Sequence, residues 1–112
     1  MSIWFDFFAG KSKIESNKTV VDTATYELNG TDGILHVTYT ATGAVTIALP
    51  SSQCINSRPF ITIKDAGGNA NTNNITLETE GSEKIDGADT LSLQTDNGSF
   101  RLYPYNSNWF TF

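Results

Sequence analysis

Apolar and polar residues alternate one by one in short stretches that recur along most of the chain. Leu35, Val37 and Tyr39 alternate with polar residues, and the run 45–49 follows the same rule. A two-residue period puts successive side chains on opposite sides of an extended backbone, so each run predicts a half-buried strand. The period recurs at Ile61/Ile63, Ile75/Leu77, Leu91/Leu93 and Phe100/Leu102. No window of helical length has an apolar stripe, so we expect an all-β chain.

Turn residues separate these runs. Asn29-Gly30, Asp32-Gly33 and Asn97-Gly98 all tolerate positive φ, which tight hairpins need. The predicted strands arrive roughly every ten residues, a spacing typical of a sandwich or barrel. We therefore predict an antiparallel β-sandwich of about seven or eight short strands over residues 19–112. Its first strand is expected within 19–28 and its last at 109–112.

Residues 1–18 do not follow this rhythm. They begin with large apolar side chains and then turn polar. The segment is too short for a membrane span and lacks the basic start of a secretory signal, so we expect no membrane partner. It is either a first strand or terminus, or an arm whose aromatic residues contact another copy or another protein. The predicted contact residues are Ile3, Trp4, Phe5, Phe7 and Phe8.

Charge and cysteine content exclude some partners. The 112 residues have a formal net charge of −5, and the seven Lys and Arg residues are scattered along the chain. Binding to a nucleic-acid backbone needs clustered cations, so we expect no nucleic-acid partner. The one cysteine, Cys54, cannot form a disulfide within the chain, which favours folding in a reducing cytoplasm.

The sequence contains little that indicates catalysis. His36, the one histidine, lies on the polar side of a predicted strand, and Cys54 lies in a polar connection. The acidic residues from 78 to 96 suggest either a carboxylate pair for glycoside hydrolysis or oxygen ligands for calcium. A glycosidase using Glu80 and Asp86 is the least favoured hypothesis. Glu78 and Glu80 share one face of a predicted strand, where like charges normally face water. We expect no enzymatic activity, no metal and no cofactor.

Two other groups of residues could bind a ligand. Five aromatic residues between positions 103 and 112 either pack in the core or a subunit interface, or form a platform for sugars. The Gly/Asn-rich stretch that follows the strand at 61–63 is a long predicted loop. The predicted ligand-facing residues are Asp65, Asn69, Asn71, Asn73 and Tyr105.

The second half of the chain resembles a known class of proteins. A strand ending in Lys64-Asp65 leads to a Gly/Asn/Ala loop, and the strand 73–76 reads Asn-Asn-Ile-Thr. An Ile-Asp-Gly turn at 85–87 and a closing Asn-Gly-Ser strand from 97 precede Trp109. Over residues 35–112 this order resembles the β-rich domains of bacteriophage tail fibres, head fibres and related virion surface proteins.

The resemblance implies a homotrimer of sandwich or jelly-roll-like subunits. It also implies a virion structural protein, made in the host cytoplasm, whose partners are the major capsid protein or another virion protein. Because no long shaft precedes the domain, a trimeric capsid decoration protein or short head fibre fits better than a whole tail fibre. The alternative is a receptor-binding tip that recognises a host surface glycan.

Overall fold

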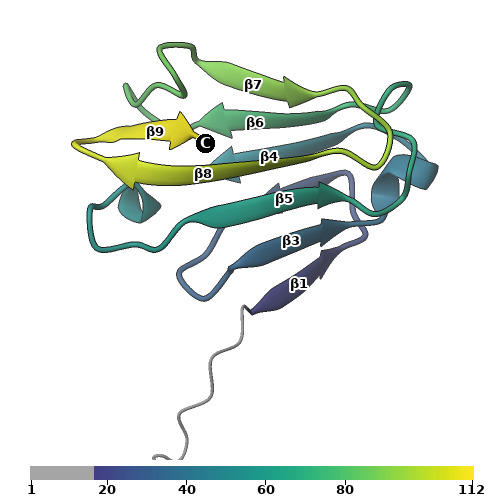
Figure 1. The fold of residues 1–112 in the computed structure, drawn as a ribbon, viewed down its shortest axis with the longest axis horizontal. Coiled ribbons are helices and arrows are strands. Elements are labelled where there is room, and N and C mark those ends of the chain that lie inside the picture. The colour runs from purple at the N-terminus through teal and green to yellow at the C-terminus, as the bar shows by residue number, and fades with distance from the viewer. Residues whose placement is uncertain (1–16) are drawn as a thin grey trace, which may run out of the picture.

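The computed structural model describes residues 17–112, which form two stacked β-sheets (Figure 1). Sheet A has the order β1-β3-β5-β8-β9 and sheet B the order β2-β4-β6-β7. The sheets are joined by short connections, two of which contain single-turn 3₁₀ helices, η1 (Tyr39–Ala41) and η2 (Ser51–Gln53). The strands are β1 (Lys18–Val21), β2 (Thr25–Glu27), β3 (Ile34–Val37), β4 (Val45–Leu49), β5 (Ile61–Asp65), β6 (Ile75–Thr79), β7 (Thr90–Leu93), β8 (Ser99–Tyr105) and β9 (Asn108–Thr111).

The first six strands alternate between the two sheets. The chain passes from β1 in sheet A to β2 in sheet B, returns to β3, and repeats this course twice. Each new strand pairs in parallel with the strand two before it. This is the winding of a short two-sheet solenoid, in which each coil contacts only its neighbours. The two-layer β class predicted from the sequence is confirmed, but the prediction of a purely antiparallel sandwich is wrong.

The last three strands reverse this pattern and pair antiparallel. β7 returns along β6, β8 along β5, and β9 along β8. The β8–β9 connection is a tight hairpin in which Asn106 and Ser107 have φ values of 49° and 65°. Positive φ at both central residues suits the twist of paired strands. The chain therefore reverses direction at residues 106–107 in a hairpin.

The other turn signals have a different use. Asn97 does adopt positive φ, at 61°, but the strands on either side of Asn97-Gly98 belong to different sheets. Asn29-Gly30 and Asp32-Gly33 likewise connect β2 of sheet B to β3 of sheet A. The single strand expected within 19–28 is two strands, one in each sheet. The turn residues thus mark changes of layer, which a local pattern does not distinguish from hairpins.

The alternating runs bury their apolar side chains between the sheets, as predicted. Leu35 and Ile63 line the inner face of sheet A, and Ile47 and Leu77 line that of sheet B, all fully buried. Trp109 of β9 is the largest side chain in this core. Burial of these apolar surfaces is the main favourable contribution to folding.

One carboxylate lies in the same buried layer. Asp65 occupies the inward position that Val21 and Val37 hold in the neighbouring parallel strands, and it has no exposed surface. Its carboxylate accepts hydrogen bonds from the Thr40 hydroxyl and from the amides of Gly68, Ala70 and Asn97. Burial alone raises the pKa of Asp65, but these four donors together hold it below its usual value.

The two edges of sheet A differ. At one edge, the segment 84–86 runs beside β9: the Trp109 amide donates to the Lys84 carbonyl, and the Asp86 amide donates to the Trp109 carbonyl. The Asp86 carboxylate also accepts bonds from the amide and hydroxyl of Thr111. At the opposite edge, β1 pairs with β3 alone among residues 17–112. Within the described residues, sheet A therefore has one covered edge and one open edge.

Candidate binding face

The outer faces of the two sheets carry opposite charge. Lys18, His36, Lys64 and Arg101 occupy outward positions of sheet A, and no outward position of its strands holds Asp or Glu. The outward positions of sheet B hold two glutamates with Thr, Ser and Ala, and no cation: Thr25, Glu27, Thr46, Ala48, Thr76, Glu78, Thr90 and Ser92. The protein is acidic overall, so the outer face of sheet A is its cationic exception.

An aromatic cluster lies on this face across the neighbouring strands β5, β8 and β9. Tyr103 is directly opposite Phe110 in the β8–β9 ladder, and their rings stack with centroids 5.7 Å apart. Phe112 meets Tyr103 edge-on at 5.5 Å and Phe60 at 5.4 Å. Phe60, Tyr103 and Phe112 are each 41–56% exposed. We call these four residues the aromatic cluster, and Tyr105 (54% exposed) follows it on the same side of β8.

Arg101 extends the aromatic cluster with a positive charge. Its guanidinium carbon lies 4.5 Å from the centroid of the Phe112 ring, a cation–π geometry. No carboxylate of residues 17–112 forms a salt bridge with it. The planar guanidinium can therefore stack on the ring and still present N–H donors at its edge to an anionic group.

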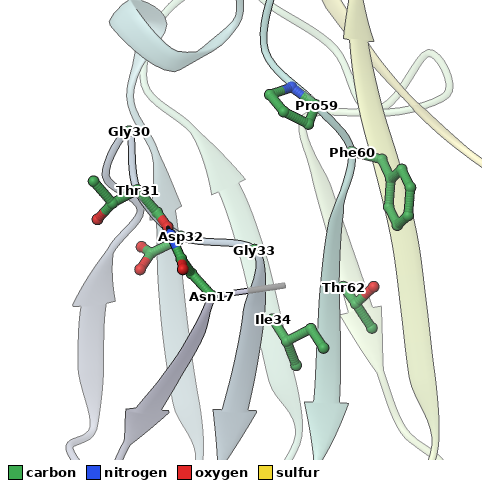
Figure 2. Close-up of a pocket in the computed structure, with 9 residues that line it drawn as sticks. All are labelled: Asn17, Gly30, Thr31, Asp32, Gly33, Ile34, Pro59, Phe60 and Thr62. Atoms are coloured by element: carbon green, nitrogen blue, oxygen red, sulfur yellow. Dashed lines mark hydrogen bonds between the residues drawn. The ribbon is translucent and has the colours of Figure 1, made fainter. Parts of the chain in front are cut away.

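A hollow of about 640 Å³ adjoins the cluster (Figure 2). The loop 30–33 forms one wall and Pro59-Phe60 the other, with Asn17, Ile34 and Thr62 between them. Phe60 belongs both to the rim of this hollow and to the aromatic cluster, and its ring points away from Asp32 (Figure 2). The hollow and the cluster are thus continuous along the outer face of sheet A.

Asp32, in the wall of the hollow, is already bonded within the protein. It is only 5% exposed and accepts hydrogen bonds from the hydroxyls of Thr19 and Tyr26 and from the Asn29 amide. The buried Arg58 guanidinium donates to the backbone carbonyls of Asn29 and Asp32. Burial first, and then the hydrogen bond from Tyr26 to Asp32 and the Asp32 charge, raise the pKa of the Tyr26 hydroxyl. These contacts, together with the bond from the Asn17 side-chain amide to the Thr31 carbonyl, hold the loop in place.

The loop predicted to face a ligand has a largely structural role. Asp65 is fully buried, and the Asn73 side-chain amide donates to the Thr40 carbonyl at 2.7 Å. The backbone carbonyl of Asn69 accepts bonds from residues 72 and 73, and the exposed Asn71 donates its amide to Asp96. The structure does not bring Tyr105 to this loop, because the loop lies at the start of β8 and Tyr105 at its end (Figure 1).

The groups considered for catalysis are dispersed. His36 is exposed on the outer face of sheet A, whereas Cys54 is buried in the core and burial raises the pKa of its thiol. Among residues 17–112, no group of three His, Cys, Asp or Glu side chains is placed to hold a metal ion. Glu80 accepts the Ser51 amide and Asp86 is bonded to Thr111, so these carboxylates belong to separate local contacts.

The five predicted contact residues of the N-terminal segment, Ile3, Trp4, Phe5, Phe7 and Phe8, lie outside the described residues. No helix within residues 17–112 is long and apolar enough to span a membrane.

Sequence reasoning identified only part of the aromatic cluster. It listed the C-terminal aromatic residues, and of these Trp109 is in the core while Tyr103, Phe110 and Phe112 are on the outer face. It missed Phe60 and Arg101. Strand parity carried the missing signal, because Phe60 and Arg101 each neighbour a buried residue of a half-buried strand and so point outward.

Comparison with known proteins adds no assignment. No known family model matches the chain, and a search of curated proteins finds no significant match.

Proposed function

We propose that this chain is a virion structural protein: a homotrimeric module that decorates a bacteriophage head by attaching to the major capsid protein or another virion protein. The observation that supports this most is the open edge of sheet A at β1. An open edge offers unpaired backbone groups to which a strand of another chain can add. The resemblance of residues 35–112 to phage fibre and decoration domains supplies the virion context.

The backbone geometry of β1 identifies the groups that such a strand would meet. The carbonyls of Asn17 and Val21 accept bonds from the amides of Ile34 and Thr38, so odd-numbered residues face β3. Residues of a strand face its two neighbours alternately. Lys18 and Val20 therefore direct their N–H and C=O groups to the open edge. The Val20 side chain is 59% exposed, which leaves apolar surface to be covered there.

The N-terminal segment is the natural source of the added strand. It contains five large apolar residues close together and directly precedes β1 in the chain. In this proposal the segment of one copy covers the open edge of a sister copy or attaches to the capsid. The chain then acts by adhesion between virion subunits and not by chemistry.

Light scattering behind a sizing column tests the proposal on the full chain. We expect a mass three times the 12.2 kDa of the monomer. Val20→Pro removes the N–H that faces the open edge and keeps every β3 bond, so it should dissociate the trimer while the domain stays folded. Val20→Thr keeps that N–H and is the matched control. A monomeric wild type, or a trimer that is unaffected by Val20→Pro, would contradict the proposal.

A receptor-binding module that recognises a host glycan is the second candidate. The exposed aromatic cluster favours it, because sugar rings stack on such side chains and a core or a covered interface would hide them. Reproducible hits on a glycan array that disappear in Tyr103→Ala would support this function. An array without hits would contradict the glycan-binding function and leave the structural role as the one remaining candidate.

A further inference from the structure

We propose that the outer face of sheet A is a binding site for a carboxylate-bearing saccharide, with sugar rings on the aromatic cluster and the carboxylate at Arg101. This inference goes beyond the structural role and specifies the ligand class of the second candidate function. It uses β5, β8 and β9, and leaves the open β1 edge free for association.

The aromatic cluster has the form of a stacking platform. Tyr103 and Phe110 are stacked, and Phe112 and Phe60 extend the apolar surface toward the hollow. The apolar C–H faces of pyranose rings pack on such surfaces, while the sugar hydroxyls remain free for polar partners. The Tyr103 hydroxyl on the exposed cluster and the Thr62 side chain at the hollow provide partners of that kind.

Charge determines which saccharide fits. Arg101 lies over Phe112 without a carboxylate partner among residues 17–112, so its N–H edge is available to one supplied by a ligand. Outward positions of sheet A carry no acid that would repel that ligand. The carboxylate that lines the hollow, Asp32, is buried and accepts hydrogen bonds from three donors. A ligand carboxylate is therefore placed at Arg101, with an uncharged part of the saccharide toward the hollow.

The face fits this ligand better than it fits two other anionic partners. A nucleic acid carries a charge on every residue and needs rows of cations, whereas this face has three Lys and Arg in a protein of net charge −5. The acidic outer face of sheet B in a second copy matches the charge of sheet A. Its outward positions hold no aromatic residue and are mainly Thr and Glu. The hollow of about 460 Å³ on that face is lined by Thr25, Tyr26, Glu27, Thr46 and Ala48, so it offers little apolar surface to receive the aromatic cluster.

The test uses the full chain and a pair of matched probes, polygalacturonate and its methyl ester, in which the sugar rings are the same and the carboxylates are neutralised. Alginate and polysialic acid extend the set of carboxylated probes. We expect at least one carboxylated probe to bind. For polygalacturonate and its ester, we expect the ester to bind roughly tenfold more weakly, the size of one lost charge-assisted hydrogen bond.

Two substitutions distinguish the contribution of the Arg101 charge from that of the aromatic cluster. Arg101→Gln should weaken binding of the carboxylated probe roughly tenfold and remove the preference over its ester. Phe112→Ala should weaken binding of both forms. Lys84→Gln is the control. It removes one positive charge away from this face, because Lys84 pairs with Asp89, and it should leave binding unchanged.

Four binding results would overturn the inference. Two concern the probes: no carboxylated probe binds, or polygalacturonate and its ester bind equally. The other two concern specificity: Arg101→Gln and Lys84→Gln lose equal affinity, or an oligothymidylate of equal charge displaces the saccharide. A change of oligomeric mass in Phe112→Ala would assign the face to contact between copies and would also overturn it. Failure of the trimer prediction leaves the four binding results readable, because they do not depend on oligomeric mass.

Discussion

The two edges of sheet A differ in how the backbone groups of the edge strand are paired within residues 17–112. The β9 edge is covered by residues 84–86, with main-chain bonds to Trp109 and side-chain bonds from Asp86 to Thr111. The β1 edge, four residues long, has no partner on its outer side among residues 17–112. An unpaired edge invites another strand, and a covered edge excludes one. Among residues 17–112, the antiparallel C-terminal part thus covers its own edge, while the parallel N-terminal part leaves an edge to which, in the proposal above, a partner strand would add.

The largest effect is expected at the covered edge. Trp109→Ala removes the largest buried side chain and should lower the free energy of unfolding by about 4 kcal/mol, measured by urea denaturation. Trp109→Phe keeps most of the ring and should cost clearly less. A loss below about 1 kcal/mol in Trp109→Ala would show that the covered edge does not depend on this core contact.

The next effect concerns the junction of the parallel and antiparallel parts. Asp65 joins Thr40, which follows β3, to Asn97, which precedes β8. Asp65→Asn replaces one acceptor oxygen with a donor facing amide N–H groups, and should cost about 3 kcal/mol. Thermal or urea unfolding at neutral pH measures this loss. Near-normal stability of Asp65→Asn would contradict the role of Asp65 as the junction.

The same carboxylate predicts a pH dependence. The pKa of Asp65 is lower in the folded protein than in the unfolded chain, so its contribution is complete above the unfolded value of about 3.9. That contribution is lost as the pH falls through the lower folded pKa. The stability difference between wild type and Asp65→Asn should therefore shrink below about pH 4. A difference that stays constant down to pH 2 would contradict this assignment.

A glycine beside the junction gives a steric test. A Cβ added to Gly67 would lie 2.2 Å from the Thr40 hydroxyl oxygen and 2.6 Å from the Thr38 carbonyl oxygen. Gly67→Ala should therefore cost about 2 kcal/mol in urea unfolding. Gly30→Ala is the control, because the nearest atom to its Cβ would be 3.7 Å away. Equal stability of the two variants would show that the loop 66–74 adjusts freely.

Smaller effects separate the two edges themselves. Asp86→Ala removes the side-chain bonds to Thr111 at the covered edge and should cost about 1 kcal/mol in urea unfolding. An equal loss in Asp22→Ala, an exposed acid just after β1 with no side-chain bond to residues 17–112, would contradict this role.

The smallest effect is expected at the open edge. Val20→Thr changes an exposed side chain and should alter the free energy of unfolding by less than about 0.5 kcal/mol. Urea unfolding of a dilute sample, in which copies do not associate, measures this directly. A loss comparable to that of Trp109→Ala would show that the β1 edge is packed within its own subunit.

The sequence predicts the layers better than the path between them. The alternation around Leu35, Ile47 and Ile63 identifies strands and their buried faces, because the two-residue period is a local property. Parallel pairing joins residues that are far apart, with Lys18 beside Ile34 and Ile34 beside Thr62. These offsets are 34 − 18 = 16 and 62 − 34 = 28 residues, so no fixed repeat reveals the coils.

The sequence predicted that aromatic residues could form a binding surface, but it did not predict which residues form it. The aromatic residues near the C-terminus suggested a platform, and β8–β9 pairing does bring Tyr103 and Phe110 together. Phe60 joins them through β5–β8 pairing across some forty positions, which no local pattern shows. Asp65 was predicted to face a ligand as part of the loop 65–74. It is buried, because its register beside Val37 places it on the inner face of sheet A.

Amide hydrogen exchange of the assembled full chain tests the open-edge account most directly. The Val20 N–H faces away from β3, so no contact among residues 17–112 protects it, whereas the Trp109 N–H is bonded to Lys84 in every copy. We expect the Val20 amide to be protected in the trimer and to exchange freely once the trimer is diluted to monomers, with Trp109 protected in both states. Free exchange at Val20 in the assembled protein would contradict the claim that β1 pairs with a partner strand.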